Sequence, residues 1–148
     1  VSGLYRPDGK PMPNGLIIRK LDACDIQDAA PMYPGFDNPD YIVDRIEAGA
    51  VYGAFLSDNT ADDTINTLAG IIGIHEEGSI GMLYVKPQYR QQKLATALET
   101  YAFNRALENG WIPYGQIIAG NEASMRLQES MGLHFSKSSV YWMTKNNA

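Results

Sequence analysis

The stretch Ile80–Leu98, IGMLYVKPQYRQQKLATAL, decides how the rest of the chain is expected to fold. Leu83, Tyr84 and Val85 are apolar and β-prone, and Pro87 stops a sheet ladder because it has no N–H group. A helical pattern begins within the next few residues. The stretch therefore predicts a strand, a loop and a helix in that order.

The loop at residues 90–95 is suited to an anion. It carries one guanidinium, one ammonium and two amides, and its backbone N–H groups lie where the helix begins. The first amides of a helix have no acceptor within the helix, and the helix dipole favours a negative charge there. The loop is either a phosphate site or an ordinary solvated connection between a strand and a helix.

The composition is that of one globular domain spanning residues 1–148. The chain is 45% hydrophobic and 20% charged, which are values of a protein with a proper core. Residues 1–15 are rich in proline and glycine, so we expect an irregular N-terminal extension there. The chain then reads as a single domain without repeats.

Charge and hydropathy exclude several kinds of partner. The net charge is -5 with no lysine-arginine cluster, which argues against nucleic acid. No apolar run approaches the length of a membrane span and the start has no apolar signal region, so we expect no membrane and a cytoplasmic location. Cys24 is the single cysteine, and the two histidines have no metal-ligand spacing, so we expect no metal.

The rest of the chain alternates strand and helix signals. Besides Leu83–Val85, strand patterns occupy residues 16–21, 50–56, 68–75, 115–119 and 134–137 with 140–144, the last two as a hairpin or one bent strand. Helix signals occupy residues 22–33, 38–48, 94–109 and 121–131. In the second of these, Asn38 is the expected cap, Pro39 the first helical residue and Gly49 the stop. This α/β (α+β) order predicts a mixed, largely antiparallel sheet of six or seven strands, with helices on both faces and one parallel crossover.

The run Val85–Ala95, V-x-P-x-Y-R-x-x-K-L-A, resembles motif A of the GNAT superfamily, acyltransferases that use acyl-coenzyme A. That motif is Q/R-x-x-G-x-G/A, and here Arg90 takes its first position and Ala95 its last. Lys93 stands where the motif has its middle glycine. Either the backbone torsion there is ordinary or the loop lies slightly differently, and the Lys93 ammonium could reach the phosphates.

A second match lies in Gly120–Leu133, GNEASMRLQESMGL, which is similar to the family's asparagine-led helix ending in Gly-Phe, with leucine in place of phenylalanine. Tyr114-Gly115, the spacing N-x-x-S-x-x-L and Tyr141-Trp142 are similar to the glycine N-acyltransferase-like branch, whose acceptors are amino acids. The order of strands and helices is also the GNAT order. The resemblance therefore covers nearly all of the chain after residue 15.

The resemblance implies a site for acetyl-CoA or another acyl-CoA. In such a site the strand Leu83–Val85 splays away from residues 115–119, binds pantetheine like an added strand and polarises the thioester carbonyl. The loop amides hold the pyrophosphate. The alternatives are that the two strands simply pair and that Asn121 only caps its helix. The residues implied for coenzyme binding are Leu83, Tyr84, Val85, Arg90, Gln91, Gln92, Lys93, Leu94, Ala95, Thr96, Asn121 and Ser124.

The usual acid and base of the family have no titratable counterpart at their positions. The tyrosine that protonates the thiolate in many members is Gln128 here, and the two positions of a glutamate base are Gln116 and Ser79. Gln116 and Ser79 could at most position a water that carries the proton outward. His134 is the third catalytic candidate, and residues 75–77, before the key strand, are further titratable groups.

A site without an evident base suits a weakly basic amine. Neutralising a lysine ammonium at pH 7 costs about 4 to 5 kcal/mol, against about 1 to 1.5 kcal/mol for an α-ammonium. We expect an N-acyltransferase that moves an acetyl or other short acyl group to a small primary amine, such as the α-amine of an amino acid. A non-catalytic acyl-CoA-binding module, a protein N-terminal acetyltransferase and a homodimer stay open.

Overall fold

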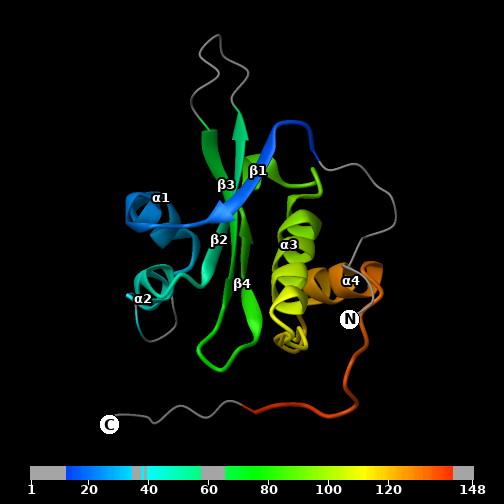
Figure 1. Cartoon of the computed structure of the whole chain (residues 1–148). Coiled ribbons are helices and arrows are strands. Elements are labelled where there is room, and N and C mark those ends of the chain that lie inside the picture. Colours follow the sequence, from blue (N-terminus) through cyan, green and yellow to red (C-terminus); the bar gives the residue numbers. More distant parts are fainter. Residues whose placement is uncertain (1–12, 35–37, 39, 58–65, 142–148) are drawn as a thin grey trace. The chain divides into compact units, whose positions relative to one another are not determined.

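The computed structural model describes residues 13–34, 38, 40–57 and 66–141. The chain divides into two compact units, Val1–Gln116 and Ile117–Ala148. The first unit contains an antiparallel sheet in the order β1-β2-β3-β4 (Figure 1). Its strands are β1 Leu16–Lys20, β2 Val51–Ser57, β3 Asn66–Ile74 and β4 Ile80–Val85.

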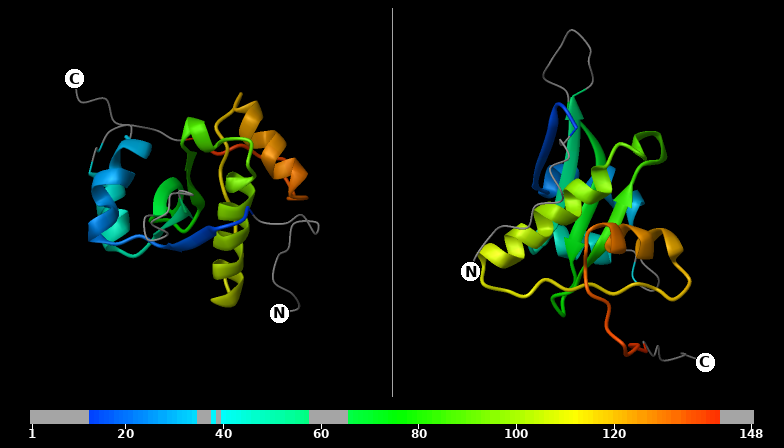
Figure 2. Two further views of the ribbon diagram at one scale, coloured as in Figure 1. Left: turned by 90° about the horizontal axis from the view of Figure 1, so that it is seen from above. Right: turned by 90° about the vertical axis from the view of Figure 1, so that its right-hand side faces the viewer.

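Helices cover both faces of this sheet, as predicted (Figure 2). One face carries a chain of short helices: η1 Ala23–Asp25, α1 Ile26–Ala29, η2 Ala30–Met32 and α2 Tyr41–Glu47. The opposite face carries α3 Leu94–Glu108, which follows the turn η3 Pro87–Tyr89. The second unit contains α4 Glu122–Ser130. No helix among the residues that the structure describes has the length and apolar character to cross a bilayer.

The main hydrophobic core lies between the sheet and the α1/α2 layer. Its buried side chains come from β2, β3, the short helices and the residue that follows β1, and they are Leu21, Ala29, Met32, Ile42, Ile46, Val51, Phe55, Leu68 and Ile71. On the opposite face, α3 buries Leu94, Leu98 and Ala102, which recur every four residues on one side of the helix. The α3 helix is therefore anchored on the sheet from its first turn.

The described residues form four strands, not the six or seven predicted. Residues 115–119 contribute one parallel bridge, which joins Gly115 to Ile80. The Ile80 N–H group donates to the Tyr114 carbonyl at 2.7 Å. The direction of the bridge is that expected for a crossover through α3. Residues 134–141 form no strand, and the remainder of that predicted strand lies outside the described residues. A β-prone run becomes a strand only against a neighbour, and the chain enters the second unit just after Gly115.

The α2 helix starts later than predicted, at Tyr41. Asn38 still organises that start, since its side chain accepts from the Asp40 N–H group at 3.0 Å and its carbonyl accepts from Tyr41 at 3.1 Å. Pro39, predicted as the first helical residue, lies outside the described residues. Gly49, with φ of +69°, follows the helix as predicted.

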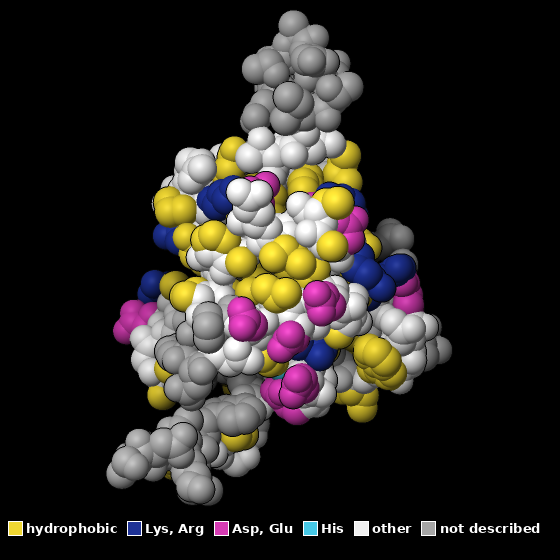
Figure 3. Space-filling model, turned by 90° about the vertical axis from the view of Figure 1, so that its left-hand side faces the viewer, with side chains coloured by type: hydrophobic (Ala, Val, Ile, Leu, Met, Phe, Trp, Pro, Cys, Tyr) yellow, Lys and Arg dark blue, Asp and Glu magenta, His cyan; other side chains and the backbone are white. Residues whose placement is uncertain are grey.

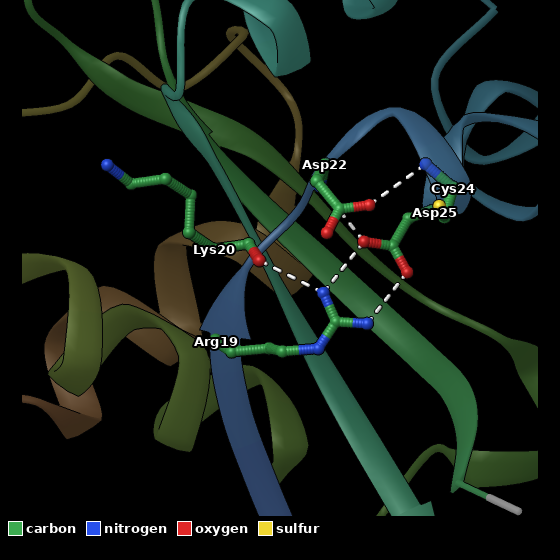
Figure 4. Close-up of polar contacts among 5 residues, drawn as sticks. All are labelled: Arg19, Lys20, Asp22, Cys24 and Asp25. Carbon is green, nitrogen blue, oxygen red and sulfur yellow. Dashed lines mark hydrogen bonds and ion pairs between the residues drawn. The ribbon is translucent and has the colours of Figure 1, made fainter.

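An ion pair ties β1 to the first short helix (Figure 4). The two terminal nitrogens of Arg19 donate to the Asp25 carboxylate at 2.7 and 2.8 Å. Asp25 also accepts from the Asp22 N–H group at 2.9 Å, and Asp22 accepts from that of Cys24 at 2.9 Å, which completes a capping box. The Arg19 guanidinium lies 4.1 Å from the centre of the Phe55 ring. This arrangement fixes where the chain leaves the edge strand.

Replacing Asp25 by asparagine is expected to lower the free energy of unfolding by about 1 kcal/mol near neutral pH, since partly exposed Arg19 is screened by solvent. The hydrogen bond from Arg19 lowers the pKa of Asp25. A lowered folded-state pKa gives stability that is complete above the unfolded value of about 3.9 and is lost as pH falls through the folded value. Urea unfolding should therefore show the difference between the two proteins shrinking below about pH 4.

The matched control is Asp28→Asn, on the neighbouring α1 helix, because Asp28 has no hydrogen-bond partner among the described residues. It should leave the stability nearly unchanged between pH 3 and pH 7. Equal effects of the two substitutions would contradict the role given to the Arg19–Asp25 pair.

Candidate functional site

The loop between β4 and α3 carries consecutive backbone amides without acceptors. None of the N–H groups of residues 91–96 donates a hydrogen bond within the described part of the chain. The flanking amides are paired, that of Arg90 with the Pro87 carbonyl at 3.3 Å and that of Ala97 with the Lys93 carbonyl at 3.0 Å. The unpaired amides thus coincide with the loop that the sequence predicts as an anion site.

The torsions of this loop are those of an anion nest. Gln91 and Lys93 both have φ of +62°, in the left-handed region. Lys93 therefore adopts the conformation for which the family motif uses glycine, so of the two alternatives left open by the sequence, an ordinary torsion at Lys93 does not hold. Residues that alternate in hand turn successive N–H groups toward a common point, where they bind an anion.

A hollow of about 280 Å³ lies over the loop. Its lining residues are Val85, Tyr89, Arg90, Gln91, Lys93, Leu94 and Ala95. The Arg90 Nε donates to the Val85 carbonyl at 3.0 Å, which holds the guanidinium beside the hollow. The guanidinium lies 5.7 Å from the centre of the Tyr84 ring, and its terminal nitrogens have no hydrogen-bond acceptor among the described residues. The hollow thus combines free cationic donors with free amides, as a pyrophosphate requires.

The β4 strand has a free edge within the first unit. It pairs with β3 on one side, from Ile80 to Val85. On the other side, pairing within the described residues is limited to the bridge between Ile80 and Gly115. The backbone groups beyond Ile80 on that edge are therefore open to an added, strand-like ligand such as an amide-containing chain.

A bulge interrupts β4 in its middle, and the sequence analysis missed it. The β3–β4 register shifts between Ile71 and Gly73, so that Met82 and Leu83 together face Ile72. Met82 has φ of +54°. A Cβ atom on Gly73 would lie 2.6 Å from the Met82 terminal methyl, so Gly73 makes room for this side chain. Gly73 was the available signal, because a glycine inside a strand marks a bulge or a close approach.

Replacing Lys93 by glycine is expected to raise the free energy of unfolding by about 0.5 to 1 kcal/mol. A side chain in the left-handed region costs about 1 to 2 kcal/mol, and glycine's greater entropy loss on folding offsets part of the gain. Urea unfolding measures the change. Lys93→Ala is the control, since it removes the ammonium but keeps the strain, and a gain of stability there would contradict the explanation.

A cluster of polar and aromatic side chains surrounds the β3–β4 hairpin. The Tyr41 hydroxyl lies 2.9 Å from His75 Nδ1, and the two rings stack with their centres 5.8 Å apart. The buried Ser79 hydroxyl donates to the Glu77 carboxylate at 2.5 Å. The Tyr114 hydroxyl donates to the Glu77 carbonyl at 2.7 Å. The hairpin is therefore held in one conformation by side chains from α2 and from the segment after α3.

Burial and hydrogen bonding shift the titrations in this cluster. Burial lowers the pKa of His75 below its ordinary value. Burial by itself raises the pKa of Glu77. The hydrogen bond from Ser79 and the nearby positive charge of Arg45 outweigh it, so the pKa of Glu77 lies below its ordinary value. At neutral pH the imidazole is thus uncharged and the carboxylate is ionised.

The three catalytic candidates lie in different surroundings. Ser79 is buried against Glu77, so it orients that carboxylate. Gln116 is exposed and comes directly after the Gly115 bridge to β4, so the first unit brings it near Ser79 in the fold. His134 is exposed in the second unit. Among the described residues, no group of three or more His, Cys, Asp and Glu side chains is placed to hold a metal ion.

Two predicted coenzyme residues also belong to the second unit. The Asn121 side-chain oxygen accepts from the Ser124 N–H group at 3.1 Å, so Asn121 caps α4 as predicted. This bond uses the amide oxygen and leaves the nitrogen of the same amide for another partner. A coenzyme role for Asn121 and Ser124 stays a prediction.

Comparison with solved structures finds the same fold in a Drosophila protein and in several acetyltransferases. A Drosophila protein matches with 22% identity and a TM-score of 0.66 over 87% of this chain, which spans 42% of that protein. The ribosomal-protein-alanine N-acetyltransferase from Brucella melitensis matches with 19% identity and a TM-score of 0.65, covering 88% of this chain and 99% of that one. Arabidopsis thaliana NAA60, in complex with acetyl-CoA, matches with 16% identity and a TM-score of 0.64, covering 79% and 85%.

Sequence comparison agrees with the fold. No curated protein matches this chain in sequence. The sequence profile of the acetyltransferase (GNAT) family, however, matches residues 21–133, which include all strands but β1 and all of the helices named above. Because this match covers most of its length, the chain belongs to the GNAT family of acetyltransferases.

Proposed function

We propose that this protein is an N-acetyltransferase that moves an acetyl or other short acyl group from acyl-CoA to a small primary amine. The observation that carries the proposal is the row of unpaired amides at residues 91–96 beside the free donors of Arg90. A helix start of this kind binds phosphate groups. The pyrophosphate of coenzyme A would lie in the hollow over the loop, with Arg90 and Lys93 assisting.

The free edge of β4 supports the rest of the coenzyme site. Pantetheine contains two amides and can pair with a strand edge as another strand would. Leu83 and Val85 would hold it, and the Leu83 N–H group would polarise the thioester carbonyl. Arabidopsis NAA60, which shares the fold, is in complex with acetyl-CoA. Arg90 already donates to the Val85 carbonyl, so pantetheine would share that oxygen or bind one residue earlier.

The acceptor side of the proposal rests on charge. Acidic side chains gather on the face that carries α1 and α2 (Figure 3), whereas the coenzyme loop has Arg90 and Lys93. An ammonium is drawn to such a face and an anion to the loop. The Brucella relative is named for acetylating the alanine of a ribosomal protein, which is an α-amine. We infer that the acceptor is the α-amine of an amino acid or of an amino-acid amide.

Two measurements test the proposal. Isothermal titration calorimetry with coenzyme A should show binding at micromolar concentration, and Arg90→Ala should weaken it about tenfold or more, as loss of a charged hydrogen-bond donor does. Release of free thiol from acetyl-CoA should then depend on an added amine from a panel of amino acids, amino-acid amides, Nα-acetyl-lysine and short peptides. Binding without turnover on any amine would favour the non-catalytic module, and turnover on peptides alone would favour an N-terminal acetyltransferase. No heat with coenzyme A would overturn the proposal.

A further inference from the structure

We propose that His75, held by Tyr41, takes the proton from the acceptor amine. This inference rests on the proposed function and adds a catalytic residue to it. None of the positions where the family resemblance implies an acid or a base can supply one here, since they are Gln116, Ser79 and Gln128. The hairpin cluster supplies a titratable side chain from a different position.

The His75 ring is aimed by its contacts. Its Nδ1 lies 2.9 Å from the Tyr41 hydroxyl, and the two rings stack at an interplanar angle of 22°. A third ring, that of Tyr33, contacts it edge-on at 6.4 Å. The Nε2 atom has no hydrogen-bond partner among the described residues. If Nδ1–H donates to Tyr41, Nε2 carries the free lone pair that a general base needs.

The free nitrogen lies against β4, the strand proposed to hold the thioester. A Cβ atom on Gly81 would lie 2.6 Å from His75 Nε2, so the absence of a side chain there leaves room for the ring. Gly81 precedes Leu83 by two residues, which is roughly 7 Å along a strand. An amine nitrogen attacking a carbonyl held at Leu83 would therefore come within reach of Nε2, directly or through one water.

The hydrogen bond to Tyr41 suits both protonation states of the imidazole. In the neutral form Nδ1–H donates to the Tyr41 oxygen, and after Nε2 gains a proton the same bond persists. Burial lowers the pKa of His75 and raises that of Tyr41, so both are uncharged at pH 7. Glu77 stabilises the imidazolium and Arg45 opposes it, and both act on His75 through space.

Every proton and bond in the proposed step is accounted for. Nε2 takes one proton from the acceptor ammonium and leaves a neutral amine. The C–N bond then forms and the C–S bond breaks, with its electron pair leaving on sulfur. The second amine proton ends on that sulfur through water, and the imidazolium releases its proton to solvent. The products are an amide, a free thiol and one proton in solution.

The first test is a titration that needs no substrate. The chain has two histidines, so the proton NMR signals of His75 and His134 are assigned by comparing wild type with His75→Gln. We expect the His75 signal to titrate below the ordinary histidine value of about 6.5, and Tyr41→Phe to move it. A His75 signal that titrates at the ordinary value in both proteins would overturn the geometry argued above.

The second test is the pH dependence of kcat/KM with the most active amino acid of the panel and with its amide, whose amine is less basic. His75→Gln is expected to lower kcat/KM at least 100-fold for the amino acid, to lower it less for the amide, and to remove the acidic limb set by His75. His75→Ala should be rescued in part by added imidazole. Equal losses for both amines with an unchanged profile would overturn the inference, because a purely structural defect has that signature.

Controls separate this inference from the proposed function. Tyr101→Phe changes a tyrosine of α3 whose ring packs against Tyr52 and not against His75, and it should keep the pH profile of wild type. Calorimetry with coenzyme A should give the same affinity for wild type and His75→Gln, because the phosphate loop follows the C-terminal end of β4, whereas His75 lies against Gly81 near its start. If coenzyme binds and thiol is released but His75→Gln behaves as wild type, only this inference fails. If wild type does not bind coenzyme, the proposed function fails.

Discussion

Replacing Ala95 by glutamate is expected to remove most coenzyme A binding while leaving the fold as stable as before, or slightly more so. Ala95 is the second residue of α3 and lines the hollow over the phosphate loop. A carboxylate at a helix N-terminus stabilises the helix by about 0.3 to 1 kcal/mol. The same carboxylate would occupy the point at which the unpaired amides bind an anion, so it would compete with the pyrophosphate and repel it.

The expected loss of affinity is about 100-fold, which corresponds to about 2.7 kcal/mol and to one or two charged hydrogen bonds. Calorimetry with coenzyme A measures the affinity and urea unfolding the stability. Ala95→Gln is the matched control, because glutamine has nearly the same volume and no charge, so it reports the steric part alone. Equal affinities of the two variants would show that the loop does not hold the phosphates.

Replacing Leu98 by alanine is expected to cost about 3 kcal/mol of unfolding free energy, the usual range for a fully buried leucine being about 2 to 5 kcal/mol. Leu98 is fully buried on α3. A Cβ atom on Gly70 of β3 would lie 3.3 Å from the Leu98 Cδ1 atom, so the leucine packs directly on the backbone of β3. The β3 backbone at Gly70 has no side chain that could move into the space left behind.

The measurement is urea unfolding, with a matched control on the same helix. Leu107→Ala removes the same atoms from a position that is only half-buried, so it should cost about 1 kcal/mol. Coenzyme A should raise the stability of Leu98→Ala by the same amount as that of wild type, if the ligand binds only the folded state. Equal costs of the two substitutions would show that α3 is not anchored through Leu98.

The stretch Ile80–Leu98 illustrates what local pattern predicts well. Its strand ends at Val85 and its helix begins at Leu94, as predicted, although the strand starts at Ile80 and not at Leu83. These bounds are well predicted because β-branched and aromatic residues, a proline and helical spacing each act on their near neighbours. The amide row at residues 91–96 follows from the helix start in the same way. The left-handed torsion of Lys93 does not, since local sterics disfavour it and the surrounding structure imposes it.

The segment after α3 shows the opposite case. Residues 115–119 have the composition of a buried strand, yet they form one bridge to Ile80. Strand formation depends on a continuous neighbour, and the chain leaves the first unit at Gln116. The predicted sheet of six or seven strands was therefore too large for the described residues.

The residues proposed to handle the amine proton could not be paired from the sequence. Tyr41 and His75 are 34 residues apart, and their contact depends on α2 packing beside the β3–β4 hairpin. The bond from the Ser79 hydroxyl to Glu77 was likewise not predicted from the sequence. Side-chain partners of this kind are decided by long-range packing, on which residue spacing carries no information.

The family was predicted from the resemblance of two motifs. Residue order and short-range preference were enough to predict the strand, loop and helix of Ile80–Leu98 and the loop whose amides await an anion. Those features depend on interactions within a few residues of one another, and these are already specified by neighbouring side chains. The free edge of β4 was implied by the family resemblance, whereas the bulge of β4, the number of strands and the pairing of His75 with Tyr41 came only from the folded chain. They depend on contacts between segments that are distant in the sequence, and these contacts form only when the helices pack on the sheet.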